Sequence, residues 1–142
     1  MRTKIAAIAA TVLLTGAALA TASPAWASDP GGGAAWDHIW TTSDATQGGT
    51  VYIEEHGDVV ELCDTAADGY APRVEILTQA SNGQYNFHYS LTASGGFGTC
   101  ITRSASNGGV YDLPENDNIA VEIYLGPHVG FDGSEHYYLN DN

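Results

Sequence analysis

The stretch CDTAADG, residues 63–69, places two carboxylates close behind a cysteine. Asp64 and Asp68 could supply oxygen ligands to calcium, but calcium takes about six to eight oxygens, and Ala66 breaks the Asp-x-Asp-x-Asp-Gly pattern. As a catalytic acid–base pair they would have to flank a cleft, for which a small domain offers little room. The third interpretation is a structural turn, with Asp64 accepting backbone N–H groups and Gly69 left-handed. We expect the turn and keep a metal at Asp64 and Asp68 as the alternative.

Two tryptophans four residues apart, Trp36 and Trp40, are candidate binding residues. They could stack on sugar rings, or they could cover one end of the fold as additional core, since aromatic side chains bury large areas. The chain has no Gly-x-Ser-x-Gly, His-Glu-x-x-His or phosphate-loop motif, and its five histidines lack a recognised ligand spacing. We therefore predict that the protein is not an enzyme and has no cofactor, apart from the calcium alternative.

The N-terminal 27 residues have the form of a secretory signal peptide. Arg2 and Lys4 precede an apolar stretch from Ile5 to about Leu19, and Ala25-Trp26-Ala27 offers small residues at a cleavage site. The stretch is short and alanine-rich for a membrane span, and no basic cluster follows it. We predict cleavage after Ala27, a secreted chain, a flexible Gly/Pro-rich segment over residues 28–35, and one domain over residues 36–142.

The exported part of the chain is strongly acidic. All 17 acidic residues but only two of the four basic ones, Arg73 and Arg103, lie after Ala27, so the formal charge of this part is −15. Such a surface repels nucleic acid and anionic lipid, which excludes both as partners. It favours solubility and a cationic partner, and we expect a monomer.

The two cysteines, Cys63 and Cys100, both belong to the exported part. An even number of cysteines in an oxidising compartment indicates a disulfide. Two cysteines do not complete a four-ligand zinc site, and neither belongs to a Cys-x-x-Cys pair. We predict a structural disulfide, and we expect it to hold two sheets together.

Strand periodicity runs through the exported part. Tyr85–Leu91 and Ile119–Leu125 alternate apolar and polar residues, which predicts that Tyr85, Phe87, Tyr89 and Leu91 share one face. Other predicted strands are 50–54, 58–63, 73–78 and 99–103, with weaker ones at 110–113 and 136–139. The segment Ser81-Asn82-Gly83 predicts a hairpin turn. The fold class is therefore all-β, a small immunoglobulin-like β-sandwich of about seven short antiparallel strands.

The segments Gly48–Val51, Gly57–Gly69 and Ile119–Gly126, with the lone Cys100, resemble small secreted proteins of actinobacteria such as Streptomyces. The similarity covers about Gly48 to His128 and implies a secreted β-sandwich with no assigned activity. These relatives often carry a further cysteine in the last strand, where this chain has Glu122-Ile123-Tyr124-Leu125-Gly126.

Size and secretion also make the chain similar to actinobacterial inhibitors of hydrolases. The Trp-Arg-Tyr triplet of the amylase inhibitors is absent, and the protease inhibitors carry four cysteines where this chain has two. We therefore expect a secreted non-enzymatic binding module whose partner is an extracellular protein or carbohydrate. Inhibition of an extracellular amylase or protease and a calcium-stabilised module are the alternatives.

Overall fold

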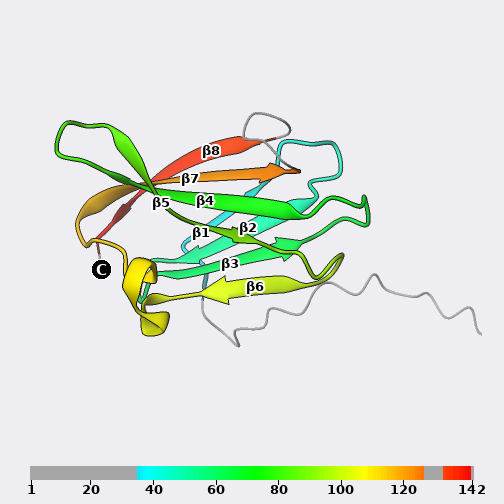
Figure 1. The fold of residues 1–142 in the computed structure, drawn as a ribbon, viewed down its shortest axis with the longest axis horizontal. Coiled ribbons are helices and arrows are strands. Elements are labelled where there is room, and N and C mark those ends of the chain that lie inside the picture. Colours follow the sequence, from blue (N-terminus) through cyan, green and yellow to red (C-terminus); the bar gives the residue numbers. More distant parts are fainter. Residues whose placement is uncertain (1–34, 127–132, 142) are drawn as a thin grey trace, which may run out of the picture.

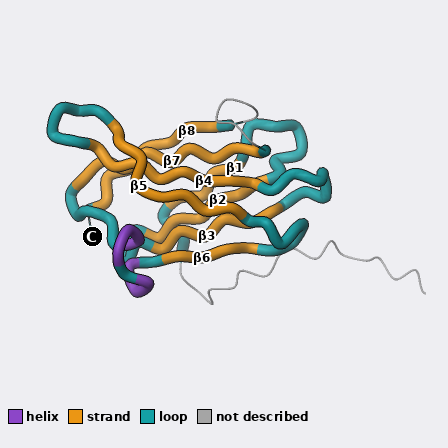
Figure 2. Tube along the Cα trace, in the orientation of Figure 1, coloured by secondary structure: helices purple, strands orange, loops and turns teal. Residues whose placement is uncertain are grey.

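The computed structural model describes residues 35–126 and 133–141. The predicted signal peptide, residues 1–27, and all but the last residue of the predicted flexible segment, residues 28–35, lie outside the described residues. Within them the chain is all-β, with two short 3-10 turns, and no described helix is long and apolar enough to cross a membrane (Figures 1 and 2). The strands are β1 (His38–Thr41), β2 (Gly49–Glu54), β3 (Val59–Asp64), β4 (Pro72–Gln79), β5 (Tyr85–Thr92), β6 (Cys100–Arg103), β7 (Asp117–Leu125) and β8 (Ser134–Asn140).

The eight described strands form two antiparallel four-stranded sheets that face one another. The first sheet has the order β1-β2-β3-β6 and the second has the order β5-β4-β7-β8. In an immunoglobulin constant-type domain the first, second, fifth and fourth strands form one sheet. The order here differs, so the all-β sandwich is confirmed but its immunoglobulin-like topology is not.

The core lies between the two sheets and follows from alternation along their central strands. Val51 and Ile53 on β2 are fully buried, and they belong to the same core cluster as Val121 and Ile123 of β7 in the other sheet. The odd-numbered residues of Ile119–Leu125 are all buried as predicted, but Ala120 and Tyr124 on the outer face are buried as well. Burial of aliphatic side chains stabilises the fold by about 25 cal/mol per Å² of apolar area removed from water.

Two of the predicted local structures differ from the structure. Residues 110–113 are not a strand, since η2 (Gly109–Tyr111) is a 3-10 turn that follows η1 (Ala105–Asn107). A strand also forms at β1, where Trp40 pairs with Val51, so the described chain has eight strands in place of about seven. The hairpin turn at Ser81-Asn82-Gly83 is confirmed by the hydrogen bond from the Gly83 N–H to the Ala80 carbonyl, 2.8 Å long.

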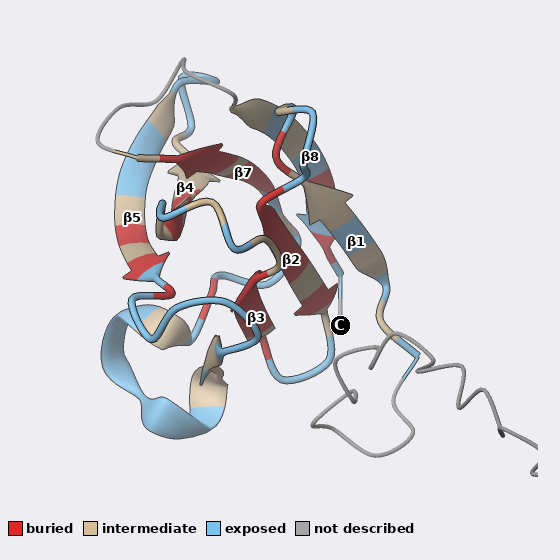
Figure 3. Ribbon diagram, turned by 90° about the vertical axis from the view of Figure 1, so that its right-hand side faces the viewer, coloured by how far each residue is buried: buried red, intermediate tan, exposed pale blue. Residues whose placement is uncertain are grey.

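Strand β5 contains a bulge that changes which face its side chains occupy. Ile76 pairs with Tyr89 but its neighbour Leu77 pairs with Phe87, so His88 has no partner of its own on β4. Tyr89 is therefore buried in the core, whereas Phe87 lies on the outer face of the second sheet. The prediction that Tyr85, Phe87, Tyr89 and Leu91 share one face was wrong for this reason (Figure 3).

The predicted disulfide between Cys63 and Cys100 is present, but it does not join the sheets. The two cysteines are directly opposite each other on the neighbouring strands β3 and β6, with Cα atoms 4.0 Å apart. Val60 and Leu62 point into the core, so alternation directs Cys63 to the outer face. The disulfide therefore fastens the edge strand β6 within the first sheet.

The two sheets contact each other directly where their edge strands β1 and β8 meet (Figure 3). The Trp40 ring stacks on the His136 ring with centroids 4.6 Å apart, and on the His38 ring at 4.8 Å. The Ser134 hydroxyl donates to the Thr41 carbonyl at 2.8 Å. This side of the sandwich is thus closed by stacked rings and one hydrogen bond between the edges.

Candidate functional site

The CDTAADG loop has the turn geometry that its sequence predicts. The Asp68 carboxylate accepts the Tyr70 N–H at 2.8 Å, the Asp64 carboxylate accepts the Ala66 N–H at 3.4 Å, and Gly69 has φ 83°. Burial raises the pKa of Asp64, and repulsion from Asp68 adds to the effect. Both carboxylates are thus used as backbone acceptors, while calcium binding by Asp64 and Asp68 stays a prediction.

A second carboxylate loop packs against this one. Asp44 accepts hydrogen bonds from the Thr42 and Thr46 hydroxyls and from the N–H groups of Thr46 and Gly48. Burial alone would raise the pKa of Asp44, but these hydrogen bonds outweigh it and lower the pKa to about 2. A Cβ at Gly48 would lie 2.7 Å from the Asp68 carboxylate, so a larger residue at this position would have to displace the Asp68 side chain.

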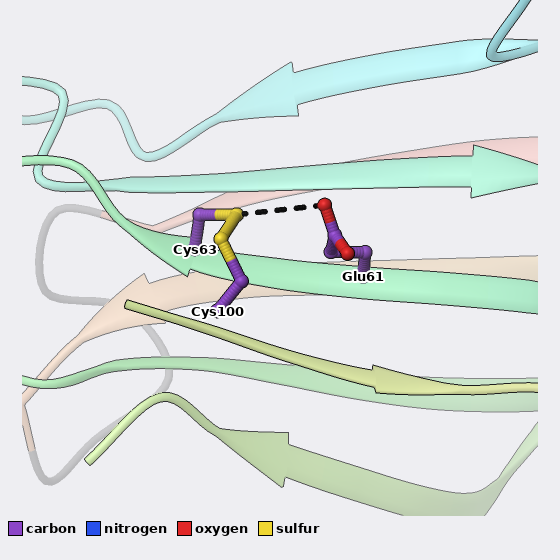
Figure 4. Close-up of side chains that lie close together, drawn as sticks. All are labelled: Glu61, Cys63 and Cys100. Atoms are coloured by element: carbon purple, nitrogen blue, oxygen red, sulfur yellow. Dashed lines mark hydrogen bonds between the residues drawn. A yellow bond between two sulfur atoms is a disulfide. The ribbon is translucent and has the colours of Figure 1, made fainter. Parts of the chain in front are cut away.

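Glu61 is buried beside the disulfide on the outer face of the first sheet (Figure 4). One of its oxygens accepts the Thr102 hydroxyl at 2.7 Å, and the other lies 3.8 Å from the Cys63 sulfur. Glu61, Cys63 and Cys100 are the described group of three ligand-type side chains whose atoms gather within 4.8 Å. Because the sulfurs bond each other and carry no free thiolate, this group does not provide a metal site in the oxidised protein.

The two tryptophans lie in different environments and do not form one surface. Trp40 is partly buried against the core, where it stacks with the imidazoles described above. Trp36 contacts Tyr52, with ring centroids 5.5 Å apart, and Tyr52 alternates with the buried Val51 and Ile53, so it lies on the outer face of the first sheet. A binding role for Trp36 and Trp40 stays a prediction, but they do not supply a shared stacking platform.

The outer face of the second sheet carries several exposed apolar side chains, most of them aromatic. Phe87 is 60% exposed, Tyr137 is 53% exposed and Leu139 is 47% exposed, and Tyr85 contacts Tyr137 with ring centroids 5.3 Å apart. We call Tyr85, Phe87, Tyr137 and Leu139 the aromatic patch. Folded monomers do not usually leave such side chains together in water without a function for them.

Beside the aromatic patch runs a row of three carboxylates, which we call the glutamate row. Glu75 of β4 pairs with Glu122 of β7, which pairs with Glu135 of β8, so the three point outward from adjacent strands. Neighbouring strands are about 4.8 Å apart, which brings three like charges into one short line. The glutamate row lies two residues along the strands from the row formed by Leu77 and Tyr137.

The three carboxylates differ in how they are compensated. Glu75 accepts the Tyr124 hydroxyl at 2.7 Å and lies 3.5 Å from the Arg73 guanidinium, and Glu135 accepts the Tyr137 hydroxyl. Burial raises the pKa of Glu122, and repulsion from Glu135 and Glu75 raises it further. The centre of the glutamate row is therefore short of positive charge.

The aromatic patch and the glutamate row were missed in the sequence. Tyr85 and Phe87 were predicted to share a face with Tyr89 and Leu91 because the bulge at His88 has no sequence signature as plain as alternation. Glu75, Glu122 and Glu135 become neighbours only through the register of three strands. The alternation in β7 and β8 could have shown that Glu122 and Tyr137 point outward, but not that they share a surface.

Another exposed aromatic side chain lies in the loop between β5 and β6. Phe97 is 64% exposed, and the loop is tied to β3 by hydrogen bonds from the Gly98 N–H to the Asp64 carbonyl and from the Asp64 N–H to the Thr99 carbonyl. The Cys63–Cys100 disulfide follows directly. The loop is thus a protruding segment with a braced base.

Comparison of the chain with protein-family models, curated proteins and solved structures finds no match.

Proposed function

We propose that the chain is a secreted, non-enzymatic binding module that uses the outer face of the second sheet. The single observation that carries this proposal is the aromatic patch, where Phe87 and Tyr137 are more than half exposed on the second sheet. Cores of protein interfaces are enriched in aromatic side chains, and a rigid sheet holds them in fixed positions. The disulfide supports an extracellular setting, because disulfides persist in oxidising compartments.

The test compares two exposed phenylalanines in the secreted protein. Retention on insoluble polysaccharides and on columns of immobilised extracellular proteins should fall after Phe87→Ala and stay unchanged after Phe97→Ala. Both residues are exposed, so the free energy of unfolding of each variant should lie within about 0.5 kcal/mol of the wild-type value. Equal retention of the Phe87→Ala variant and wild type on every matrix that holds the protein would contradict the proposal.

Inhibition of an extracellular hydrolase is the second candidate function. The observation that favours it is Phe97 on a protruding loop whose base is fastened by the disulfide and by two hydrogen bonds to β3. A rigid loop loses little conformational entropy when it enters an active-site cleft, which favours tight inhibition.

The same pair of variants separates the two functions. A panel of secreted amylases and serine proteases, including ones that accept aromatic side chains, should be assayed with excess protein. If the loop is inhibitory, Phe97→Ala should weaken inhibition by at least tenfold, and Phe87→Ala should not. No inhibition across the panel at a large molar excess would exclude this function.

A further inference from the structure

We infer that the outer face of the second sheet binds a basic segment of a partner protein, with arginine or lysine side chains on the glutamate row and apolar side chains on the aromatic patch. This inference rests on the proposed function, because it names the partner of the same face. It commits to a protein in preference to a sugar polymer or a second copy of this chain.

The arrangement of the face provides two parallel strips of different chemistry. Across β4, β7 and β8 the glutamate row offers Glu75, Glu122 and Glu135. Two residues further along β4 and β8 come Leu77 and Tyr137, while Ala120 between them on β7 is fully buried. The two strips lie about 7 Å apart at a rise of about 3.3 Å per residue. A segment lying across the strands, with basic groups on one side and apolar groups on the other, would contact both strips at once.

Charge complementarity points to a cationic partner. The nearest arginine in the sheet, Arg73, lies beside Glu75. After Lys4 the sequence has no lysine, and Arg103 is the only other arginine in that part. Arg103 lies on β6, in the other sheet, over the ring of Tyr111. A cation from outside would relieve the repulsion at Glu122, and it would also interact favourably with the faces of Phe87 and Tyr137.

The geometry of the aromatic patch favours a protein over a sugar polymer. The rings of Tyr85 and Tyr137 are inclined by 52° to each other, so they do not form one flat stacking platform. Leu139 is 47% exposed and has no ring face for a sugar, but it suits an apolar side chain. The hydroxyls of Tyr124 and Tyr137 already donate to glutamates, which leaves them less able to bind sugar hydroxyls.

A second copy of the chain is a poor occupant for electrostatic reasons. Two such faces in contact would bring two glutamate rows together in a chain whose exported part has two arginines against 17 acidic residues. Like charges placed in contact oppose association.

The experiment measures binding of three fluorescent probes to the secreted protein by anisotropy. The probes are a peptide of alternating arginine and leucine, the same peptide with glutamate in place of arginine, and an oligomer of glucosamine. The first should bind, the second should not, and the glucosamine oligomer should bind more weakly than the first. Raising the salt concentration from about 0.05 M to 0.5 M should weaken binding of the basic peptide several-fold, because exposed charges are screened.

Charge-removing variants locate the site. Glu122→Gln and Glu135→Gln should each weaken binding of the basic peptide about two- to fivefold, and Phe87→Ala should weaken it at least fivefold. Glu115→Gln, in the exposed loop before β7, is the matched control and should bind as wild type does. The glutamine variants should remain folded, since the repulsion that raises the pKa of Glu122 disfavours its charge in the folded state.

The outcomes separate the two proposals. No binding of the basic peptide, tighter binding of the glucosamine oligomer, or equal binding by the Glu122→Gln, Glu135→Gln and wild-type proteins would overturn the inference. If in these cases Phe87→Ala still weakens retention on another ligand, the proposed function stands. If Phe87→Ala has no effect on any ligand that binds, the proposed function fails as well.

Discussion

Tyr85 and Tyr137 are in ring contact although they come from β5 and β8, the two opposite edges of the second sheet. Two strands lie between them, which in a flat sheet would separate the edges by about 14 Å. Their contact therefore reaches across the outer face and covers Ala120, which is fully buried although it points outward from β7. The contact joins the edges of the sheet and supports the aromatic patch.

Because the rings contact each other, substitutions of the two tyrosines should not be additive. Tyr85→Ala and Tyr137→Ala should each lower the unfolding free energy, and a double-mutant cycle should give a coupling of about 0.5–1.5 kcal/mol. Denaturant unfolding of the four proteins measures this quantity. Strictly additive effects would show that the two rings do not interact in solution, and the pair Phe87→Ala with Phe97→Ala serves as the uncoupled control.

The stacked rings between β1 and β8 should make stability depend on pH. Burial lowers the pKa of His136 below 6.5, so the unfolded chain takes up a proton at a higher pH than the folded chain does. The unfolding free energy should therefore fall as the pH drops below about 6.5. In His136→Phe, which keeps a ring beside Trp40 but cannot be protonated, this part of the pH dependence should disappear.

Thermal or denaturant unfolding of both proteins between pH 7.5 and 5 provides the measurement. His56, an exposed residue after β2, supplies the control variant His56→Phe, which should keep the wild-type profile. A His136→Phe profile with the same slope as wild type would mean that the acid sensitivity arises elsewhere.

Much of the fold could be predicted from the sequence because its central strands obey simple alternation. Ile119–Leu125 lies between two other strands in a regular register, so its pattern shows which side chains point into the core, although Ala120 and Tyr124 are also buried on the outer face. The edge strand β5 carries a bulge, and one extra residue at His88 reverses the faces of all residues before it. The alternation of apolar and polar residues therefore failed to predict which side chains of β5 face the core, because this strand is irregular.

The positions of paired groups depend on strand register, which local pattern does not contain. Cys63 and Cys100 were correctly paired from the redox argument, but their place within one sheet requires the pairing of β3 with β6. The outward direction of the Cys63 side chain could have been predicted, because Cys63 follows the buried Leu62 on an alternating strand. No local sequence pattern predicts the glutamate row, because Glu75 and Glu122 become neighbours only through the pairing of β4 with β7.

For the CDTAADG loop we expect turn capping and no calcium requirement. The Asp68 carboxylate accepts the Tyr70 N–H, so Asp68→Ala should lower the unfolding free energy by about 1 kcal/mol, while Asp68→Asn keeps an acceptor oxygen and should cost less. Melting midpoints with millimolar calcium and with chelator should agree. A midpoint that rises with calcium in wild type and not in Asp68→Asn would instead establish the calcium-stabilised alternative, because a ligand of the native state raises stability.

The disulfide should stabilise the chain without holding the two sheets together. Its cysteines are separated by 37 positions, and in the chain-entropy treatment closing such a loop contributes about 4 kcal/mol. The double variant Cys63→Ala/Cys100→Ala should lose a free energy of this order in denaturant unfolding. That loss is a large share of the roughly 5–15 kcal/mol typical of a domain.

The position of the disulfide also predicts where the loss appears. In the part of the chain that the structure describes, β6 is an edge strand paired with β3, so hydrogen exchange in the double variant should quicken first in residues 93–103. Amides of β4 and β7 should remain protected until global unfolding. Equal loss of protection in both sheets would show that the link between Cys63 and Cys100 does stabilise the packing of one sheet on the other.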